Sequence, residues 1–286
     1  MKAKRFCENA IHGWFLLMGL VTVGCVLLIT VYLIISGIPA IREIGLVKFL
    51  FGPVWDSNAA EPQFGILSFI LTSVYGTAGA IVLGVPVGFM TAVFLAKMAP
   101  PRLKAVVGAA VNLLAGIPSV VYGLVGMLVF AQTLGFKTCL LSGSLTLVIM
   151  NLPTIIRTTQ ESLKTVPQGY REGALGLGAG KWHIIRTIVL PCSIDGIVTG
   201  CILAVGRIVG ESAALLFTAG AAEVIAKSVF KAYTSNGATL SVLLYLRAFE
   251  DGDFTSAWGI GAVLLVLVLL INLAARLAKI KLKQKQ

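Results

Sequence analysis

The sequence predicts an all-α, polytopic membrane protein with six transmembrane helices. The chain has 286 residues, a mean hydropathy of +0.94 and only 12% charged residues, roughly half the charged fraction of an average soluble domain. Uncharged apolar runs such as 14–36 and 257–275 are long enough to cross about 30 Å of hydrocarbon as helices. The 31 glycines are typical of closely packed membrane helices, because small residues let backbones approach. A soluble enzyme and a collagen-like chain are therefore excluded.

Basic residues predict the orientation of these spans. The six spans are expected at about 14–36, 66–96, 105–134, 139–156, 192–219 and 257–275. With both termini in the cytoplasm, the cytoplasmic segments hold 16 Lys and Arg and the outward segments hold six, as the positive-inside rule requires. The topology of insertion into the bilayer thus explains the net charge of +11 better than binding to nucleic acid does. The first run follows Lys2, Lys4 and Arg5 like a secretion signal, but its length and the lack of a clear cleavage site indicate a retained anchor.

The second span contains a helix-packing face. As a straight helix, residues 66–96 would be about 46 Å long, so the span must tilt, bend or protrude, and Pro86 is the expected bend. Small residues fall four apart along it and again in the fifth span, which predicts smooth faces for close packing. These residues are Gly76, Ala80, Gly84 and Gly88 in the second span, and Gly196, Gly200 and Ala204, then Gly206, Gly210 and Ala214, in the fifth.

Two longer segments, 37–65 and 220–256, lie outside the membrane in this topology. Within the second, Glu223–Phe230 and Thr239–Phe249 are apolar but too short to span, so we expect short helices at the interface. A soluble partner on that side would dock on these segments. We divide the chain into an N-terminal anchor helix with its outward segment, 1–65, and a transmembrane domain, 66–286.

The segment 165–191, between the fourth and fifth spans, predicts a compact cytoplasmic element of two short helices. Pro167 suits a first helical turn, and the glycines between 176 and 180 allow the chain to turn. A second helix from about Lys181 to Leu190 is expected to stop at Pro191. An element of this kind has the shape of a lever that a cytoplasmic partner can push.

The spacing within this element resembles the EAA loop of bacterial ABC import permeases, E-A-A-x3-G-x9-I-x-L-P. The matching residues are Glu172, Gly173, Ala174, Gly178, Ile188, Leu190 and Pro191. Gly173 replaces the usual alanine, which loosens the helix by up to about 1 kcal/mol. The resemblance implies that the loop docks in a groove of an ATP-hydrolysing subunit.

Three further stretches narrow the resemblance to phosphate-import permeases of the PstA type; they are 116–123, 151–159 and 206–219. This resemblance covers the chain from about residue 60 to the end. The resemblance implies a type I ABC importer permease fold in the bacterial inner membrane and phosphate import by alternating access. It also implies a PstC-like sister permease, two PstB-like ATPase subunits that bind ATP and Mg, and a PstS-like phosphate-binding protein. The alternatives are a permease for another solute of the same import class and a stand-alone six-helix transporter.

The chain itself is expected to hold no nucleotide, cofactor or metal, and to be a transport subunit rather than an enzyme. The run Gly176–Lys181 superficially suggests a phosphate-binding loop, but Leu175 and Trp182 stand where a Walker motif needs Gly and Ser or Thr. His12 and His183 have no metal-ligand spacing, and the five cysteines form no C-x-x-C pair.

The predicted substrate pathway centres on Arg207 and Glu211, one helical turn apart in the fifth span, with Thr218 farther along the same face. An arginine at the bilayer centre costs about 2.5–3.5 kcal/mol, so it should face a partner or water. Its planar fork of donors suits a tetrahedral oxyanion. Protonated phosphate can also donate to Glu211, whereas sulfate cannot. The alternative is that the two charges only neutralise each other.

Arg157, at the end of the fourth span, is a second candidate anion contact, or else an arginine that reaches the headgroups. Four other polar residues in apolar runs either line a pathway or bond a neighbouring helix, and we favour the second. They are Asn112, Ser119, Tyr122 and Asn151.

Overall fold

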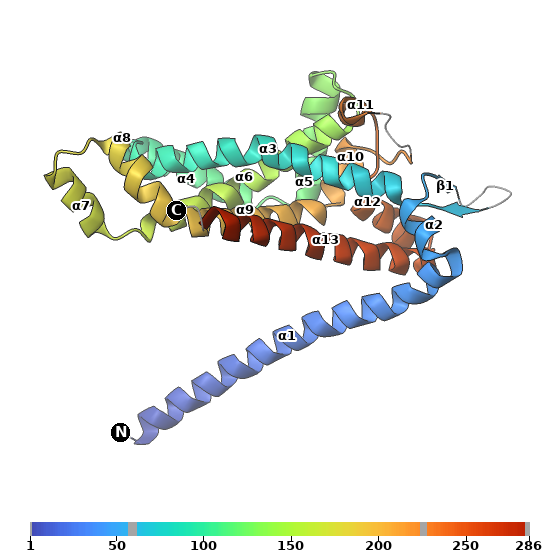
Figure 1. Cartoon of the computed structure of the whole chain (residues 1–286), viewed down its shortest axis with the longest axis horizontal. Helices are drawn as coiled ribbons and strands as arrows, with labels where there is room; N and C mark the ends of the chain where they lie inside the picture. Colours follow the sequence, from blue (N-terminus) through green and yellow to red (C-terminus); the bar gives the residue numbers. More distant parts are fainter. Residues whose placement is uncertain (1, 57–61, 224–227, 284–286) are drawn as a thin grey trace.

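The computed structural model describes residues 2–56, 62–223 and 228–283. Most of the chain is a bundle of helices that run along one long axis, with the α7 end and the β1 end at opposite extremes (Figure 1). The long helices are α1 (Lys2–Ile44), α3 (Leu67–Lys97), α6 (Leu140–Lys164), α9 (Leu190–Val209) and α13 (Phe254–Lys283). The shorter ones are α2 (Leu46–Phe51), α4 (Pro101–Ala115), α5 (Ser119–Gly126), α7 (Gln168–Gly176), α8 (Lys181–Ile184), α10 (Ala213–Thr218), α11 (Val229–Thr234) and α12 (Leu240–Tyr245).

Three π-helical segments extend the α-helices. They are η1 (Met127–Thr133), η2 (Ile185–Val189) and η3 (Leu246–Glu250). The two strands, β1 (Trp55–Asp56) and β2 (Gln63–Phe64), form an antiparallel pair in the register Trp55–Phe64 and Asp56–Gln63. Among the described residues, five helices are long and apolar enough to cross a membrane, and a bent helix pair makes up to a sixth span. The predicted all-α polytopic class is confirmed.

The prediction of one continuous third span over 105–134 is wrong. Residues 101–115 and 119–133 form two helices bent by 104° at the break between them. Pro118 explains the break, because its ring pushes the preceding residue out of the helical region. Gly116 ends α4, and α5 starts directly after the proline.

The fifth span also differs from the prediction of one helix over 192–219. The helix begins at Lys181, continues through η2 and ends at Val209, and α10 begins only at Ala213. The prediction that Pro191 ends the second helix of the cytoplasmic element is therefore wrong. The wider π-helical turn directly before Pro191 relieves the clash between the proline ring and the preceding carbonyl groups.

The small-residue face of α3 and that of Gly196 and Gly200 in α9 pack against α6, as predicted. The predicted row of Gly206, Gly210 and Ala214 is not one face, because α9 ends at Val209, and Gly206 lies near Asn272 of α13 instead. A Cβ atom added to Gly76 would lie 3.1 Å from Leu140, and one added to Gly88 would lie 2.7 Å from Ile155. In α9, Gly196 and Gly200 approach Ser162 and Thr158 of α6 in the same way. The helix α3 continues through Pro86 without a break.

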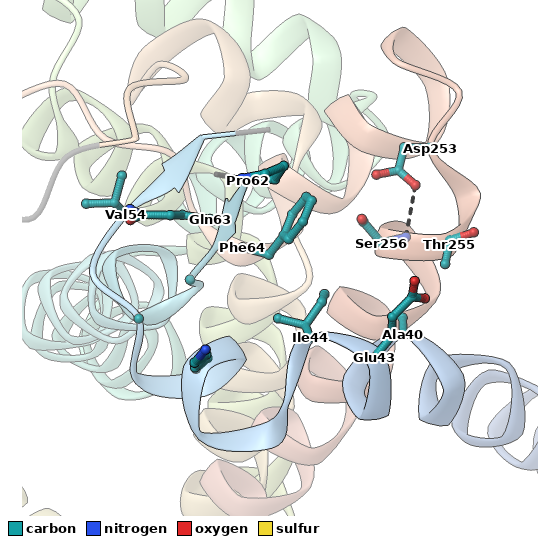
Figure 2. Close-up of a pocket in the computed structure, with 13 residues that line it drawn as sticks. Ala40, Glu43, Ile44, Val54, Pro62, Gln63, Phe64, Asp253, Thr255 and Ser256 are labelled. Carbon is teal, nitrogen blue, oxygen red and sulfur yellow. Dashed lines mark hydrogen bonds between the residues drawn. The ribbon is translucent and has the colours of Figure 1, made fainter. Parts of the chain in front are cut away.

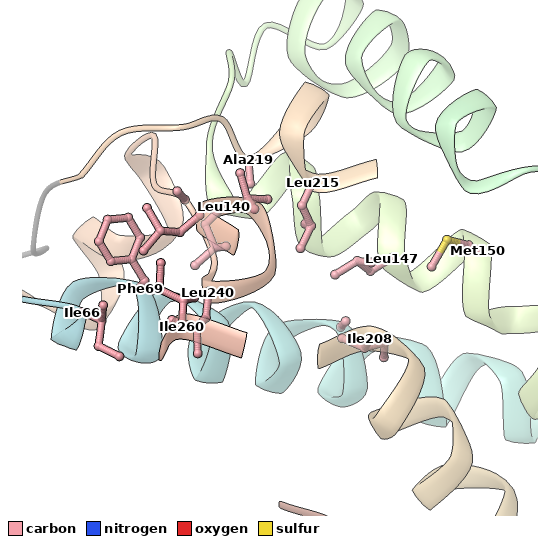
Figure 3. Close-up of a cluster of buried hydrophobic side chains, with 14 of the residues drawn as sticks. Ile66, Phe69, Leu140, Leu147, Met150, Ile208, Leu215, Ala219, Leu240 and Ile260 are labelled. Carbon is pink, nitrogen blue, oxygen red and sulfur yellow. The ribbon is translucent and has the colours of Figure 1, made fainter. Parts of the chain in front are cut away.

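The larger apolar core lies toward the β1 end of the bundle and joins α3, α6, α10, α12 and α13 (Figure 3). Buried side chains from each of these helices meet there; they include Phe69, Leu140, Leu215, Leu240 and Ile260. The Leu240 amide donates to Ser73 Oγ at 2.8 Å, which fixes α12 against α3. Phe49 and Trp55 belong to the same core.

The first helix is an exposed anchor. Its apolar window is wholly unburied, and α1 diverges from α13 toward the N-terminus, which lies at the α7 end with the C-terminus (Figure 1). Only its C-terminal part packs on α13: the rings of Tyr32 and Trp258 meet edge to face at 5.3 Å. Helix formation in the outward segment is confirmed for 240–250, whereas residues 224–227 of the other expected helix lie outside the described residues.

Candidate functional site

Two interrupted helices meet in the middle of the bundle. The break between α4 and α5 and the break between α9 and α10 both fall in the stretches 116–123 and 206–219 that the sequence singled out. The helices after the breaks pack closely, since a Cβ atom at Gly123 would lie 2.9 Å from the Ala214 Cα. Interrupted helices leave backbone groups unpaired, which is tolerated at membrane depth only beside protein or a water-filled cavity. Such breaks are typical of substrate sites in transporters.

Arg207 lies in the last turn of α9, directly before the break. Its side chain is exposed on a stripe of α9 that also carries Cys192, Thr199, Leu203 and Gly210. Within the described ranges it forms no ion pair. The cationic end of the side chain is therefore available to an anion or to a partner subunit that covers this stripe.

Tyr122 joins the two helices on either side of the break between α4 and α5. The Tyr122 hydroxyl donates to the Leu114 carbonyl at 2.8 Å and so bridges α4 and α5 across their break. The sequence identifies Tyr122 only as a polar residue in an apolar run, because no local pattern in it predicts that two broken helices converge.

The prediction that Glu211 lies on the same helical face as Arg207 is wrong, because α9 ends before Glu211. Glu211 lies in the break, where its Oε1 accepts from the Ala214 amide at 3.2 Å and caps α10. Its carbonyl accepts from Ser241 Oγ at 2.8 Å. The alternative of mutual neutralisation finds no support either, since no ion pair joins Arg207 and Glu211 in the described part of the chain.

Thr218 is fully buried rather than on the exposed stripe of Arg207. Its hydroxyl donates to the Ala214 carbonyl at 2.7 Å, and its own carbonyl accepts from the Cys139 amide. The expectation of one shared face is wrong because α10 is a separate helix. In this conformation Thr218 stabilises the packing of α10.

Arg157 does not close the fourth span, because α6 continues to Lys164. The exposed Arg157 donates from Nη2 to Asn112 Oδ1 of α4, which links the two helices as we expected of Asn112. Asn151 is buried and donates from Nδ2 to the Leu147 carbonyl at 2.9 Å, within its own helix. A role of Arg157 in anion binding stays a prediction.

The element 165–191 forms the short first helix that its sequence predicts, α7, whereas its second helix is the start of the longer helix that continues through η2 into α9. The helices α7 and α8 extend beyond the bundle (Figure 1), and the turn between them needs a glycine at Gly178, whose φ is +81°. Pro167 directly precedes α7 rather than lying in its first turn. Glu172 and Gly173 are exposed, as is the neighbouring Leu177 at 90%. These residues form a face that is open to a partner.

The other residues of the predicted coupling motif face inward. Ala174, Ile188 and Leu190 pack against an apolar cluster, which we call the coupling core. Its buried members are Val93, Leu163, Val166, Ile184, Ile185 and Val189. Pro191 is partly buried at the start of α9. The coupling core therefore joins the exposed face of α7 to the ends of α3, α6 and α9.

A charged cluster at the opposite end of the bundle has no counterpart among the sequence predictions. Arg247 contacts Glu223 and Asp251 at 2.6 Å each, and its guanidinium lies 5.0 Å from the centre of the Trp55 ring. Burial raises the pKa of Glu223, and the charge and hydrogen bond of Arg247 partly offset the effect. Sequence gives no signal for this cluster, because its members come from three separate segments.

A cavity of about 750 Å³ lies near this cluster, between α1, α2, the β1–β2 pair and α13 (Figure 2). Glu43, Lys48 and Asp253 are its charged lining residues. Asp253 Oδ1 accepts from the Ser256 amide at 3.1 Å and so caps α13. None of the predicted pathway residues lines this cavity.

Comparison with known proteins shows the family from the sequence and a shared fold from solved structures. Residues 84–283 match the family described as binding-protein-dependent transport system inner membrane component. The phosphate transport system permease protein PstA 1 of Mycobacterium tuberculosis is 38% identical over 72% of this chain and 69% of its own length. PstC of Mesorhizobium japonicum is 34% identical over 80% of this chain and 77% of its own length. A subunit of a bacterial alginate ABC transporter, solved with an alginate-bound periplasmic protein, has a TM-score of 0.66 at 15% identity, covering 96% of this chain and 97% of that one.

Proposed function

This chain belongs to the family of binding-protein-dependent transport system inner membrane components, and from that membership we propose that it is the PstA-type permease subunit of an ATP-driven phosphate importer. It has the fold of type I ABC importer permeases. Phosphate as the solute is supported by the names of its relatives at 38% and 35% identity. The geometry of Arg207 adds an independent physical reason, since its donors have no carboxylate partner in the described chain.

The observation that carries the proposal is the coupling element. Its motif spacing matches that of import permeases, and its exposed helix α7 rests on an apolar core shared with α3, α6 and α9. A push on α7 is therefore transmitted to the ends of three helices, because packed apolar cores shift as units. Arg207 lies at the far end of one of these helices.

Alternating access follows from this connection. When the ATPase subunits bind ATP and close, they displace α7, and α9 moves with it. The two states differ in how the stripe of Arg207 packs, and ATP binding shifts the equilibrium between them. This chain makes and breaks no covalent bond. ATP and Mg bind to PstB-like partner subunits, and this chain requires no cofactor.

The orientation follows from the charge distribution. The α7 end and both termini face the cytoplasm, where the positive-inside rule puts basic residues. The opposite end, with α12, the β1–β2 pair and the Arg247 cluster, faces outward and receives a PstS-like binding protein. A PstC-like permease covers the stripe of Arg207 and completes the pathway.

In the proposed site, Arg207 binds the phosphate oxygens through its guanidinium. Glu211 uses Oε1 to cap α10, which leaves Oε2 to accept a hydrogen bond from protonated phosphate. Sulfate, which is fully deprotonated near neutral pH, would instead be repelled by this carboxylate. The break between α9 and α10 thus provides one group that attracts any oxyanion and one that favours phosphate.

The test is phosphate uptake by the complete transporter with Arg207→Gln. Loss of a charge-assisted contact predicts uptake that is lower by about 10- to 100-fold. Arg276→Gln, which changes an exposed arginine on α13, is the matched control and should transport normally. Assembly of each variant is measured by copurification of the partner subunits. Normal uptake by an assembled Arg207→Gln transporter would contradict the proposed site.

A further inference from the structure

A second basic site lies at the α7 end of the bundle, apart from the predicted pathway. A cavity of about 230 Å³ lies between α3, α4, α6 and α7, and each of these helices contributes one cationic side chain to it. The four residues are Lys97, Lys104, Lys164 and Arg171. The remaining lining residues are Ala96, Gln160, Val166 and Gln168, so no carboxylate lines the cavity.

The four cations have no anionic partner in the structure. In the described ranges no salt bridge involves any of them. Like charges that converge on one cavity repel each other, and screening by water is weaker where the side chains are half-buried. Lys97 and Arg171 are half-buried in this way, whereas Lys104 and Lys164 lie exposed at the rim. An anion in the cavity would remove this repulsion.

The protein satisfies only part of the hydrogen-bonding capacity of the two deeper cations. Lys97 Nζ donates to the Leu163 carbonyl at 3.3 Å, and Arg171 Nη2 donates to the same carbonyl at 3.4 Å. Arg171 Nε is buried and has no partner among the described residues. Two cations thus share one weakly bound acceptor near the end of α6, and their other donors remain for a ligand.

We propose that this cavity binds a phosphoryl group, either as free inorganic phosphate or as the headgroup of an anionic phospholipid. A tetrahedral phosphate offers several acceptor oxygens, which suits one guanidinium and three ammonium groups that approach from four helices. Basic pockets between transmembrane helices on the cytoplasmic side are typical sites for anionic headgroups. The inference rests on the proposed function only for placing this cavity on the cytoplasmic side.

Occupancy of the cavity has a structural consequence, because one of its cations belongs to the coupling helix. Arg171 precedes Glu172 of the exposed docking face on α7. A bound phosphoryl group would hold α7 against α3, α4 and α6. The site thus connects an anion at the membrane surface to the helix that the ATPase subunits move.

The experiment uses the complete transporter in nanodiscs and has two arms. In the first, binding of radiolabelled inorganic phosphate is measured in nanodiscs of phosphatidylcholine alone, with Arg207→Gln present throughout to remove the pathway site. In the second, native mass spectrometry measures how much phosphatidylglycerol the transporter retains from mixed nanodiscs. The test variant is Lys104→Gln with Lys164→Gln, since among the described residues the side chains of these rim lysines form no hydrogen bond or salt bridge. Arg102→Gln, on the same helix as Lys104 but outside the cavity lining, is the matched control.

We expect the double variant to weaken binding about tenfold in one arm, as the loss of charge-assisted contacts predicts, and Arg102→Gln to leave binding unchanged. The arm that responds identifies the source of the phosphoryl group. Equal binding by wild type and double variant in both arms would overturn the proposal, as would an equal loss with Arg102→Gln. Loss of the ATPase subunits with anion binding intact would also overturn it, because the lysines would then be docking residues.

If the double variant does not assemble, Lys97→Gln and Lys97→Arg are compared, and only the first should lose the anion. Phosphate uptake is not a readout in either arm, so failure of this site is distinguishable from failure of the proposed function.

Discussion

Arg207 and Glu211 show how two charges in an apolar protein can serve different purposes. Arg207 is exposed at the end of α9, while Glu211 caps the first turn of α10. In lipid an arginine costs about 2.5–3.5 kcal/mol, so its stripe is expected to face a partner subunit or water. The carboxylate of Glu211 is held near that stripe by the backbone of the next helix.

We predict that Glu211→Gln reduces the discrimination between phosphate and sulfate. The amide oxygen can still cap α10, but its lower negative charge repels sulfate less. Stimulation of ATP hydrolysis by each anion in the reconstituted transporter provides the measurement. A variant that still transports phosphate and excludes sulfate as strictly as wild type would refute this role.

Glu223 provides a pH-dependent prediction outside the membrane. Burial raises the pKa of the Glu223 carboxyl above its ordinary value, so the folded state binds the proton more tightly than the unfolded state. Its contribution to stability is therefore lost as the pH rises from the unfolded pKa through the raised folded pKa. Glu223→Gln removes this loss, so stability relative to wild type should increase with pH across that window. Thermal unfolding in detergent at a series of pH values measures the stability difference between Glu223→Gln and wild type. Glu250→Gln, at an exposed position, is the control. A stability difference that does not change with pH would contradict a raised pKa of Glu223.

At the scale of elements, α6 is the helix around which the others pack. It meets the small-residue face of α3 on one side and that of α9 on another. Such contacts bring backbones close and gain dispersion energy, which is a main source of helix association in membranes. The coupling core at its end and the broken helices beside it depend on the position of α6.

Gly88→Ala should destabilise the packing of α3 on α6. The new methyl group would come within 2.7 Å of buried Ile155, and overpacking of this kind costs about 1–3 kcal/mol. Gly108→Ala in α4 is the matched control, since nothing lies within 4 Å of the added methyl group and alanine favours the helix by about 1 kcal/mol. Thermal unfolding of the two variants should therefore shift in opposite directions. A Gly88→Ala protein as stable as wild type would show that this contact is loose.

At the scale of the whole molecule, the protein has two rigid ends joined by long helices. The larger apolar core fixes the β1 end, and the coupling core fixes the α7 end (Figures 1 and 3). Along the chain, Arg207 and the break after α9 lie between the coupling core, at the start of α9, and α10, which belongs to the larger core. This arrangement allows partners at either end to change the packing in the middle without unfolding either end.

The proposed orientation predicts which end a membrane-impermeant thiol reagent can reach. In a background without the five native cysteines, Leu177→Cys should react only from the cytoplasmic side, and Phe249→Cys only from outside. Both positions are well exposed, at 90% and 78%. Labelling of right-side-out and inside-out vesicles makes the comparison. The reverse pattern would place α7 outside and remove the basis for coupling to ATP.

The sequence by itself determined the membrane class, the approximate spans, the small-residue face of the second span and the first helix and glycine turn of the coupling element. These features depend on local hydropathy, on four-residue spacing and on glycine and proline within a few residues, all of which are readable along the chain.

The tertiary structure decided where helices break. Pro118 lies in the break between α4 and α5, whereas Pro86, Pro153 and Pro191 lie within helices. A proline costs a helix about 3 kcal/mol, and packing decides whether that cost is tolerated: η2 accommodates Pro191, while α5 packs on α10 after the break at Pro118. The separation of Glu211 from Arg207 and the convergence of four cations on one cavity likewise depend on contacts between distant segments, which no local pattern encodes.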